Sequence, residues 1–135
     1  MLLGMPVAID TSVLIEAEKA GSFEHILPRD ESGPFYVPAL AAAEFLVGTH
    51  PPVSDNLRYR ALLLYQSRIR PIVGKFTEAD AVQLGILISE LAGKGQQMKF
   101  FDACIAAGVI ARGDTLLTAD GDFDRLADRI TLLKL

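Results

Sequence analysis

Short apolar runs alternate with helical segments along this chain, and this alternation constrains the fold more than any other feature of the sequence. The segments between the runs have the apolar spacing and the boundary residues of helices. The runs are rich in β-branched residues and cover residues 7–9, 35–37, 71–73, 115–118 and 130–133. Strands joined through helices are parallel, and helices then cover both faces of their sheet. We therefore expect an α/β protein, a three-layer α/β/α sandwich around a central, mostly parallel sheet of about five strands.

The helices between these runs have recognisable boundaries. Thr77 and Asp80 have the spacing of a capping box, and Gly21 and Gly113 are typical helix ends. Pro38 suits the first turn of the helix that follows the second strand. The expected helices cover residues 11–19, 39–47, 57–69, 77–92, 101–111 and about 121–128.

Composition limits the class of protein. The 135 residues are 50% hydrophobic and 22% charged, which is typical of one globular domain over residues 1–135. A single cysteine excludes an intramolecular disulfide and a cysteine-rich zinc site. No apolar run has the length of a membrane span, and the N-terminus lacks the basic region of a secretory signal. We therefore expect a cytoplasmic protein that does not contact a membrane.

The net charge of −4 argues against a protein that binds nucleic acid mainly through positive charge. It does not exclude an enzyme acting on nucleic acid, because acids gathered in a metal site can mask a basic face elsewhere.

Four acidic residues lie where ordinary surface acids do not. Asp10 and Asp120 follow buried strands, at the edge of a parallel sheet where ligands bind. Glu44 and Asp102 lie in helices that are apolar on nearly every side, where a carboxylate must be paired, hydrogen-bonded or close to a cation. The alternatives are structural: helix capping by the two strand-end acids, an ion pair with a distant arginine, and a favourable helix dipole.

Convergence of these four acids would indicate a metal site. Carboxylates that share a small volume raise one another's pKa, and a hard divalent cation relieves their repulsion. Oxygen ligands without histidine or cysteine suit Mg²⁺ or Mn²⁺. Such an ion activates water and stabilises charge on phosphate oxygens, so the implied chemistry is metal-assisted hydrolysis of a phosphodiester.

The segment from residue 58 to residue 75 contains several basic residues and no acidic residue. Such a stretch is either an ordinary solvated helix face or a surface that contacts phosphate or a partner. Arg58 and Arg60 are the candidates for contact with the phosphates of a nucleic acid.

The order and context of the four acids resemble the PIN domain family, in particular small toxin ribonucleases of the VapC type. The resemblance covers nearly the whole chain and rests on VAIDTSVLI at residues 7–15, AE at 43–44, DACIAA at 102–107 and LTADGDF at 117–123. It implies the layered fold described above and RNA cleavage that depends on Mg²⁺ or Mn²⁺. It also implies that four residues are catalytic and bind metal, namely Asp10, Glu44, Asp102 and Asp120.

The same resemblance implies supporting residues and partners. Ser12 and Thr118 match hydroxyl positions that support the acids. Asp122 competes with Asp120 for the last acidic position, and we favour Asp120. Toxins of this type form homodimers and are neutralised by a small antitoxin, so a homodimer, an antitoxin and an RNA substrate are the partners implied.

The function expected is therefore that of a metal-dependent endoribonuclease, the toxin of a toxin–antitoxin pair. Two alternatives stay open: a PIN-like nuclease of RNA processing and a catalytically inactive PIN-like binding module. A phosphoacceptor receiver domain has a similar length and sheet. It is disfavoured because Gly74 and Lys75 follow the third strand, where an acceptor aspartate is required.

Overall fold

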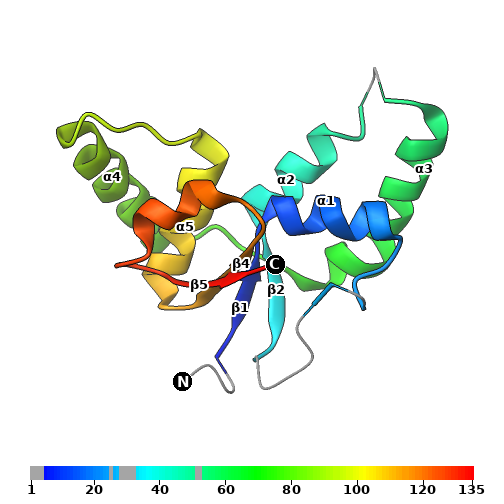
Figure 1. The fold of residues 1–135 in the computed structure, drawn as a ribbon, viewed down its shortest axis with the longest axis horizontal. Coiled ribbons are helices and arrows are strands. Elements are labelled where there is room, and N and C mark those ends of the chain that lie inside the picture. Colours follow the sequence, from blue (N-terminus) through cyan, green and yellow to red (C-terminus); the bar gives the residue numbers. More distant parts are fainter. Residues whose placement is uncertain (1–4, 25, 28–32, 51–52) are drawn as a thin grey trace.

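A computed structural model describes residues 5–24, 26–27, 33–50 and 53–135 of the protein. Its centre is a five-stranded sheet in the order β3-β2-β1-β4-β5, in which every neighbouring pair is parallel (Figure 1). The strands are β1 (Val7–Ile9), β2 (Phe35–Pro38), β3 (Val73–Gly74), β4 (Thr115–Thr118) and β5 (Thr131–Lys134). Helices flank the sheet, so the α/β/α fold expected from the sequence is confirmed.

The helices lie close to the predicted segments. The capping box is present, since Thr77 Oγ1 accepts from the Asp80 amide and Asp80 Oδ2 accepts from the Thr77 amide. Gly21 and Gly113 end their helices with positive φ, which glycine adopts without strain. The long helices are α1 (Thr11–Ala20), α2 (Ala39–Val47), α3 (Asp55–Leu64), α4 (Glu78–Gly93) and α5 (Phe100–Arg112). The short ones are η1 (Tyr65–Ile69), η2 (Arg70–Ile72) and η3 (Gly121–Leu126). None of these described helices is long and apolar enough to cross a membrane.

The segment before the third strand differs from the prediction. A strand was expected over residues 71–73, but helical structure continues to Ile72 and only Val73 and Gly74 pair with β2. Pro71 explains part of the difference, because it lacks the amide N–H of a strand ladder and suits a short helical turn. The preceding helix also changes form, since α geometry ends at Leu64 and a π turn follows.

Pro38 immediately precedes α2, which covers the predicted residues 39–47. It is the last residue of β2 and pairs with Gly74 of the edge strand β3. A proline fits there because it ends the strand and immediately precedes the helix.

The two central strands place their ends side by side. Ile9 of β1 lies opposite Leu117 of β4, and the Asp10 amide donates to the Leu117 carbonyl over 2.9 Å. Residues 7–9 are completely buried, as expected for parallel strands covered on both faces. Helix α2 contacts both α1 and α5 beside these strand ends (Figure 1). The residues after β1 and β4 therefore emerge among three helices.

Arg112 connects the end of α5 to α4 and to the loop after β3. Its guanidinium donates to Asp80 Oδ2 over 2.7 Å, to the Lys75 carbonyl over 2.7 Å and to the Gly108 carbonyl over 2.8 Å. The Asp80 side chain is only 2% exposed, so the ion pair compensates a buried charge. Gly108 leaves room for this contact, because a Cβ there would lie 2.8 Å from Arg112 Nη1.

We predict that Arg112→Met lowers the free energy of unfolding by about 3 kcal/mol, because it leaves the Asp80 carboxylate buried without its cation. Arg129→Met is the matched control, since its partner Glu90 is half exposed and the loss should stay below about 1 kcal/mol. Urea denaturation of both variants measures the difference. Equal losses would contradict a structural role for the buried pair.

Candidate active site

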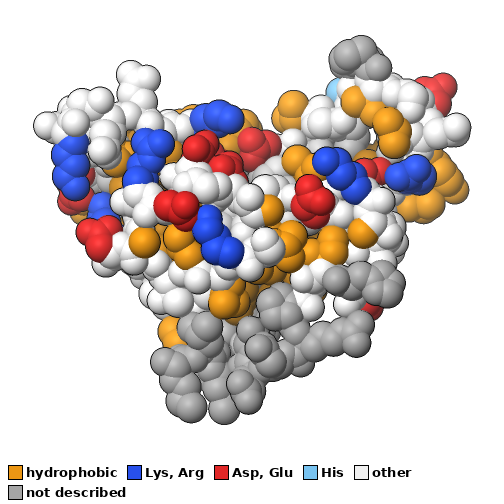
Figure 2. Space-filling model, in the orientation of Figure 1, with side chains coloured by type: hydrophobic (Ala, Val, Ile, Leu, Met, Phe, Trp, Pro, Cys, Tyr) orange, Lys and Arg blue, Asp and Glu red, His pale blue; other side chains and the backbone are white. Residues whose placement is uncertain are grey.

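All four predicted acids line one pocket at the carboxyl ends of β1 and β4. The cavity measures about 170 Å³. Its acids come from four elements: Asp10 follows β1, Glu44 lies in α2, Asp102 in the first turn of α5 and Asp120 before η3. In Figure 2, acidic side chains gather near the notch between the part of the molecule that holds α4 and α5 and the part that holds α2 and α3.

Asp10 is the most enclosed of these acids, with 2% of its surface exposed. Its Oδ2 atom accepts hydrogen bonds from Ser12 Oγ at 2.7 Å and from Thr118 Oγ1 at 2.9 Å. Its Oδ1 atom is buried and has no hydrogen-bond partner among the described residues. Burial raises the pKa of this carboxyl, and the hydroxyl hydrogen bonds oppose the rise. A buried oxygen without a partner is costly, and a bound cation would satisfy it.

The two hydroxyls that hold Asp10 also position the backbone near Asp120. The Ala119 amide donates to Ser12 Oγ and the Asp120 amide donates to Thr118 Oγ1, each over 2.9 Å. The two hydroxyl oxygens are themselves 3.3 Å apart. Ser12 and Thr118 thus lie where the sequence analysis proposed supporting hydroxyls.

Asp102 experiences the combined charge of the cluster. Burial, followed by the negative charges of Asp10, Glu44 and Asp120, raises the pKa of its carboxyl to about 6. The positive charge of Lys99 opposes this rise. A proton therefore competes with any cation for Asp102 as the pH falls toward 6.

Asp122 joins the cluster as well. Oxygen atoms of Asp102, Asp120 and Asp122 lie within 4.8 Å of one another, close enough to hold one ion. Asp122 is exposed, and its amide donates to Asp120 Oδ1 over 2.9 Å. Asp120 therefore caps η3, the structural alternative considered for it, while it also lines the pocket.

Glu44 lies at the edge of the pocket and is only half-buried. Its helix is less enclosed than its apolar sequence suggested, since Val47 is 65% exposed. Glu44 also borders a neighbouring cavity of about 290 Å³ that reaches Leu57 and Ala61 of α3. No ion pair joins Glu44 to a basic residue in the described part of the chain, so the structural alternative of a salt bridge finds no support there.

The donor atoms of the pocket are chemically uniform. They are carboxylate and hydroxyl oxygens, without histidine or cysteine, a set that suits Mg²⁺ or Mn²⁺ more than Zn²⁺. The unpartnered Oδ1 of Asp10 and the close oxygens of the other aspartates both fit a hard divalent cation.

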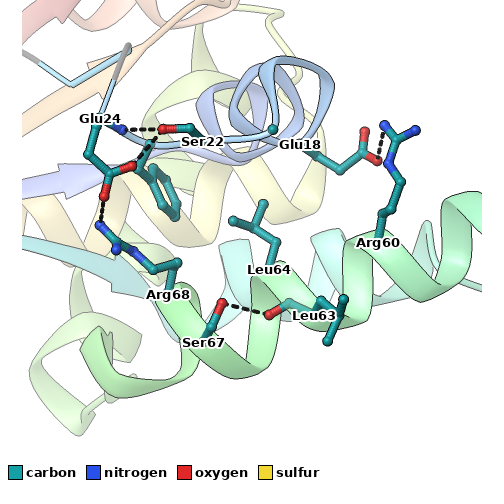
Figure 3. A pocket seen from close by; sticks show the side chains of 10 residues that line it. Glu18, Ser22, Glu24, Arg60, Leu63, Leu64, Ser67 and Arg68 are labelled. Carbon is teal, nitrogen blue, oxygen red and sulfur yellow. Dashed lines mark hydrogen bonds and ion pairs between the residues drawn. The ribbon is translucent and has the colours of Figure 1, made fainter.

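The two candidate RNA-contacting arginines lie on α3 and do not line the acidic pocket. Arg60 pairs with Glu18 at 3.3 Å, on the rim of a separate cavity of about 450 Å³ beside the end of α1 (Figure 3). Arg68 and Glu24 form a second ion pair at this cavity. Arg58 is exposed and has no ion pair among the described residues.

Lys99 is the pocket residue that sequence reasoning missed. It is exposed, precedes the first residue of α5 and lines the pocket with the acids. Its spacing from Asp102 is the feature of the sequence that could have identified it, because a residue three positions before Asp102 lies on the same side of the helix start.

Comparisons of this chain with a family model and with solved structures agree with one another. A sequence model of the PIN domain matches residues 7–129. VapBC from Salmonella typhimurium bound to DNA has a similar fold, with a TM-score of 0.80 and 20% identity over 96% of this chain and 98% of that chain. VapBC2 from Rickettsia felis, bound to a DNA fragment of its promoter, gives a TM-score of 0.79 and 19% identity over 97% and 99%.

A third similar structure is VapC20 from Mycobacterium tuberculosis, described as a toxin that cleaves the sarcin–ricin loop. Its TM-score is 0.65, with 16% identity over 96% of this chain and 99% of that one. No curated protein matches the chain in sequence. The match to the PIN domain covers most of the chain, from β1 through η3. The protein therefore belongs to the PIN domain family.

Proposed function

We propose that the protein is a metal-dependent endoribonuclease that hydrolyses RNA phosphodiester bonds and acts as the toxin of a toxin–antitoxin pair. The observation that carries this proposal is Asp10. Two hydroxyls hold one of its oxygens, the other oxygen is buried without a partner, and the residue lines a pocket that three more acids share. A protein gains nothing in stability from this arrangement unless a cation binds there.

The four acids would have different roles in such a site. Asp10, Asp102 and Asp120 would hold one Mg²⁺ or Mn²⁺ ion, directly or through water. When bound, an ion of this kind lowers the pKa of a coordinated water and offsets charge on the phosphate oxygens. Glu44, at the edge of the cluster, would orient the attacking water or help to hold a second ion.

The hydroxyls and the outer aspartate have positioning roles. Ser12 and Thr118 fix the rotamer of Asp10 through its Oδ2 atom, which leaves Oδ1 for the ion. Asp122 is close enough to contribute an oxygen. Its exposure favours contact through water. We therefore propose that Asp120, and not Asp122, joins Asp10, Glu44 and Asp102 as the fourth acidic ligand.

The toxin role is supported by the similar structures. The Salmonella and Rickettsia proteins are VapBC assemblies bound to DNA, and VapC20 is described as a toxin that cleaves an RNA loop. For this protein we propose an RNA substrate, a small antitoxin partner, a homodimer and a place in the cytoplasm without membrane contact. Of the two arginines proposed to contact RNA, Arg58 is the stronger candidate, because Arg60 already pairs with Glu18.

We predict that Asp10→Asn abolishes RNA cleavage and removes stabilisation by Mn²⁺, because the amide lacks the negative charge that the ion requires. A ligand at one hundred times its Kd stabilises a protein by about 2.7 kcal/mol, so the melting temperature of the wild type should rise with Mn²⁺ and fall back with EDTA. The measurements are cleavage of labelled RNA and thermal melting.

Asp128→Asn is the matched control, since Asp128 is exposed and does not line the acidic pocket. It should cleave and respond to Mn²⁺ like the wild type. Cleavage by Asp10→Asn at the wild-type rate would contradict the assignment. Stabilisation by Mn²⁺ without cleavage of any RNA would favour the inactive binding module.

We also predict that Asp120→Asn weakens Mn²⁺ binding by at least tenfold more than Asp122→Asn, a difference of about 1.4 kcal/mol. Asp120 lines the pocket, whereas Asp122 is exposed and is not one of the lining residues. Isothermal titration calorimetry gives both affinities. The reverse order would show that Asp122 is the fourth ligand.

A further inference from the structure

The acidic pocket contains one basic side chain among the described residues that line it, and that residue is Lys99. Lys99 immediately precedes α5, while Asp102 lies in the first turn of the same helix. Both line the pocket, so the N-terminal end of α5 borders it. The position of Lys99 relative to Asp102 is therefore fixed by the helix, although the lysine side chain itself is flexible.

The Lys99 side chain is not held by a contact in the described part of the chain, although its charge lowers the pKa of Asp102. It is exposed, and it forms no ion pair with an acid in the described part of the chain. No side chain caps the start of α5, so the first amides of this helix add partial positive charge at the same place. The ammonium group is thus free to meet an anion.

The charge balance of the pocket requires such a group. Four ionised carboxylates outweigh one divalent cation by two charges, so the loaded site would still repel a phosphate. Arg58 and Arg60 do not offset this repulsion locally, because they do not line the pocket. A lysine that lines the pocket reduces this excess to one charge and gives an approaching phosphodiester a local positive contact.

We propose that Lys99 contacts a non-bridging oxygen of the scissile phosphate and holds it against the acid cluster. This inference rests on the proposed nuclease function and adds a substrate-binding residue to it. The alternative is that Lys99 only neutralises the acids, as a fixed counter-charge.

The two roles differ in their effect on RNA binding: a fixed counter-charge predicts that Lys99→Met leaves RNA affinity unchanged, whereas a phosphate contact predicts a loss of RNA affinity. If Lys99 contacts phosphate, Lys99→Met should weaken RNA binding by about tenfold, the effect of losing one charge-assisted hydrogen bond. The same change removes a positive charge from the acids, so Mn²⁺ should bind as tightly as in the wild type or more tightly. The slope of log affinity against log salt should decrease by about 0.7, as for one lost contact to single-stranded RNA.

The experiment measures binding of a fluorescent mixed-sequence RNA in Ca²⁺ at several salt concentrations, with Mn²⁺ affinity and cleavage kinetics measured in parallel. Lys94→Met is the matched control, because Lys94 is an exposed lysine at the end of α4 and does not line the acidic pocket. Lys99→Arg should restore most of the RNA affinity, since it keeps the charge.

The outcomes separate the two proposals. Wild-type cleavage together with unchanged RNA binding and salt slope in Lys99→Met would overturn the role of Lys99 and leave the nuclease function standing. Equal weakening of RNA and Mn²⁺ binding would show a structural role for Lys99 and would also overturn the inference. Failure of the wild type to bind or cleave RNA would contradict the nuclease function and this inference with it.

Discussion

The hydrogen bonds from Ser12 and Thr118 to one oxygen of Asp10 hold the candidate site together. They join the end of β1, the start of α1 and the end of β4. The same hydroxyls accept from the backbone amides of Ala119 and Asp120, so the loop that presents the last acid depends on them as well. Without this set of hydrogen bonds, Asp10 would lose its fixed rotamer and Asp120 its defined position.

Two buried aspartates differ in how the surrounding groups compensate their charges. Asp80 is almost completely buried, but Arg112 compensates its charge and its other contacts cap α4. Asp10 is equally buried and forms no ion pair in the described part of the chain, so only uncharged hydroxyl and backbone donors oppose the cost of burying its charge. The neighbouring acids add repulsion and raise the pKa of Asp102. A site of this kind costs stability without its cation and binds the cation more strongly for that reason.

The sequence predicted most of the fold and the acids because both depend on local patterns. Parallel strands place their carboxyl ends at one edge, which brought Asp10 and Asp120 together, and the apolar surroundings of Asp102 marked it as unusual. Other features depend on tertiary placement that a single sequence does not show. Lys99 resembles any exposed lysine until α5 is placed beside the pocket. The short apolar run at residues 71–73 suits a strand or a helical turn equally well, and Pro71 favours the turn.

The most direct test of the account is to locate a bound ion. Crystals of the protein soaked in Mn²⁺ should give an anomalous scattering peak about 2.1 Å from the free Oδ1 atom of Asp10, with oxygens of Asp102 or Asp120 also in range of the ion. That result would show that the unpartnered oxygen is kept for a metal. A peak at a different cluster of acids, or no peak at saturating Mn²⁺, would show that this pocket is not a metal-dependent catalytic site.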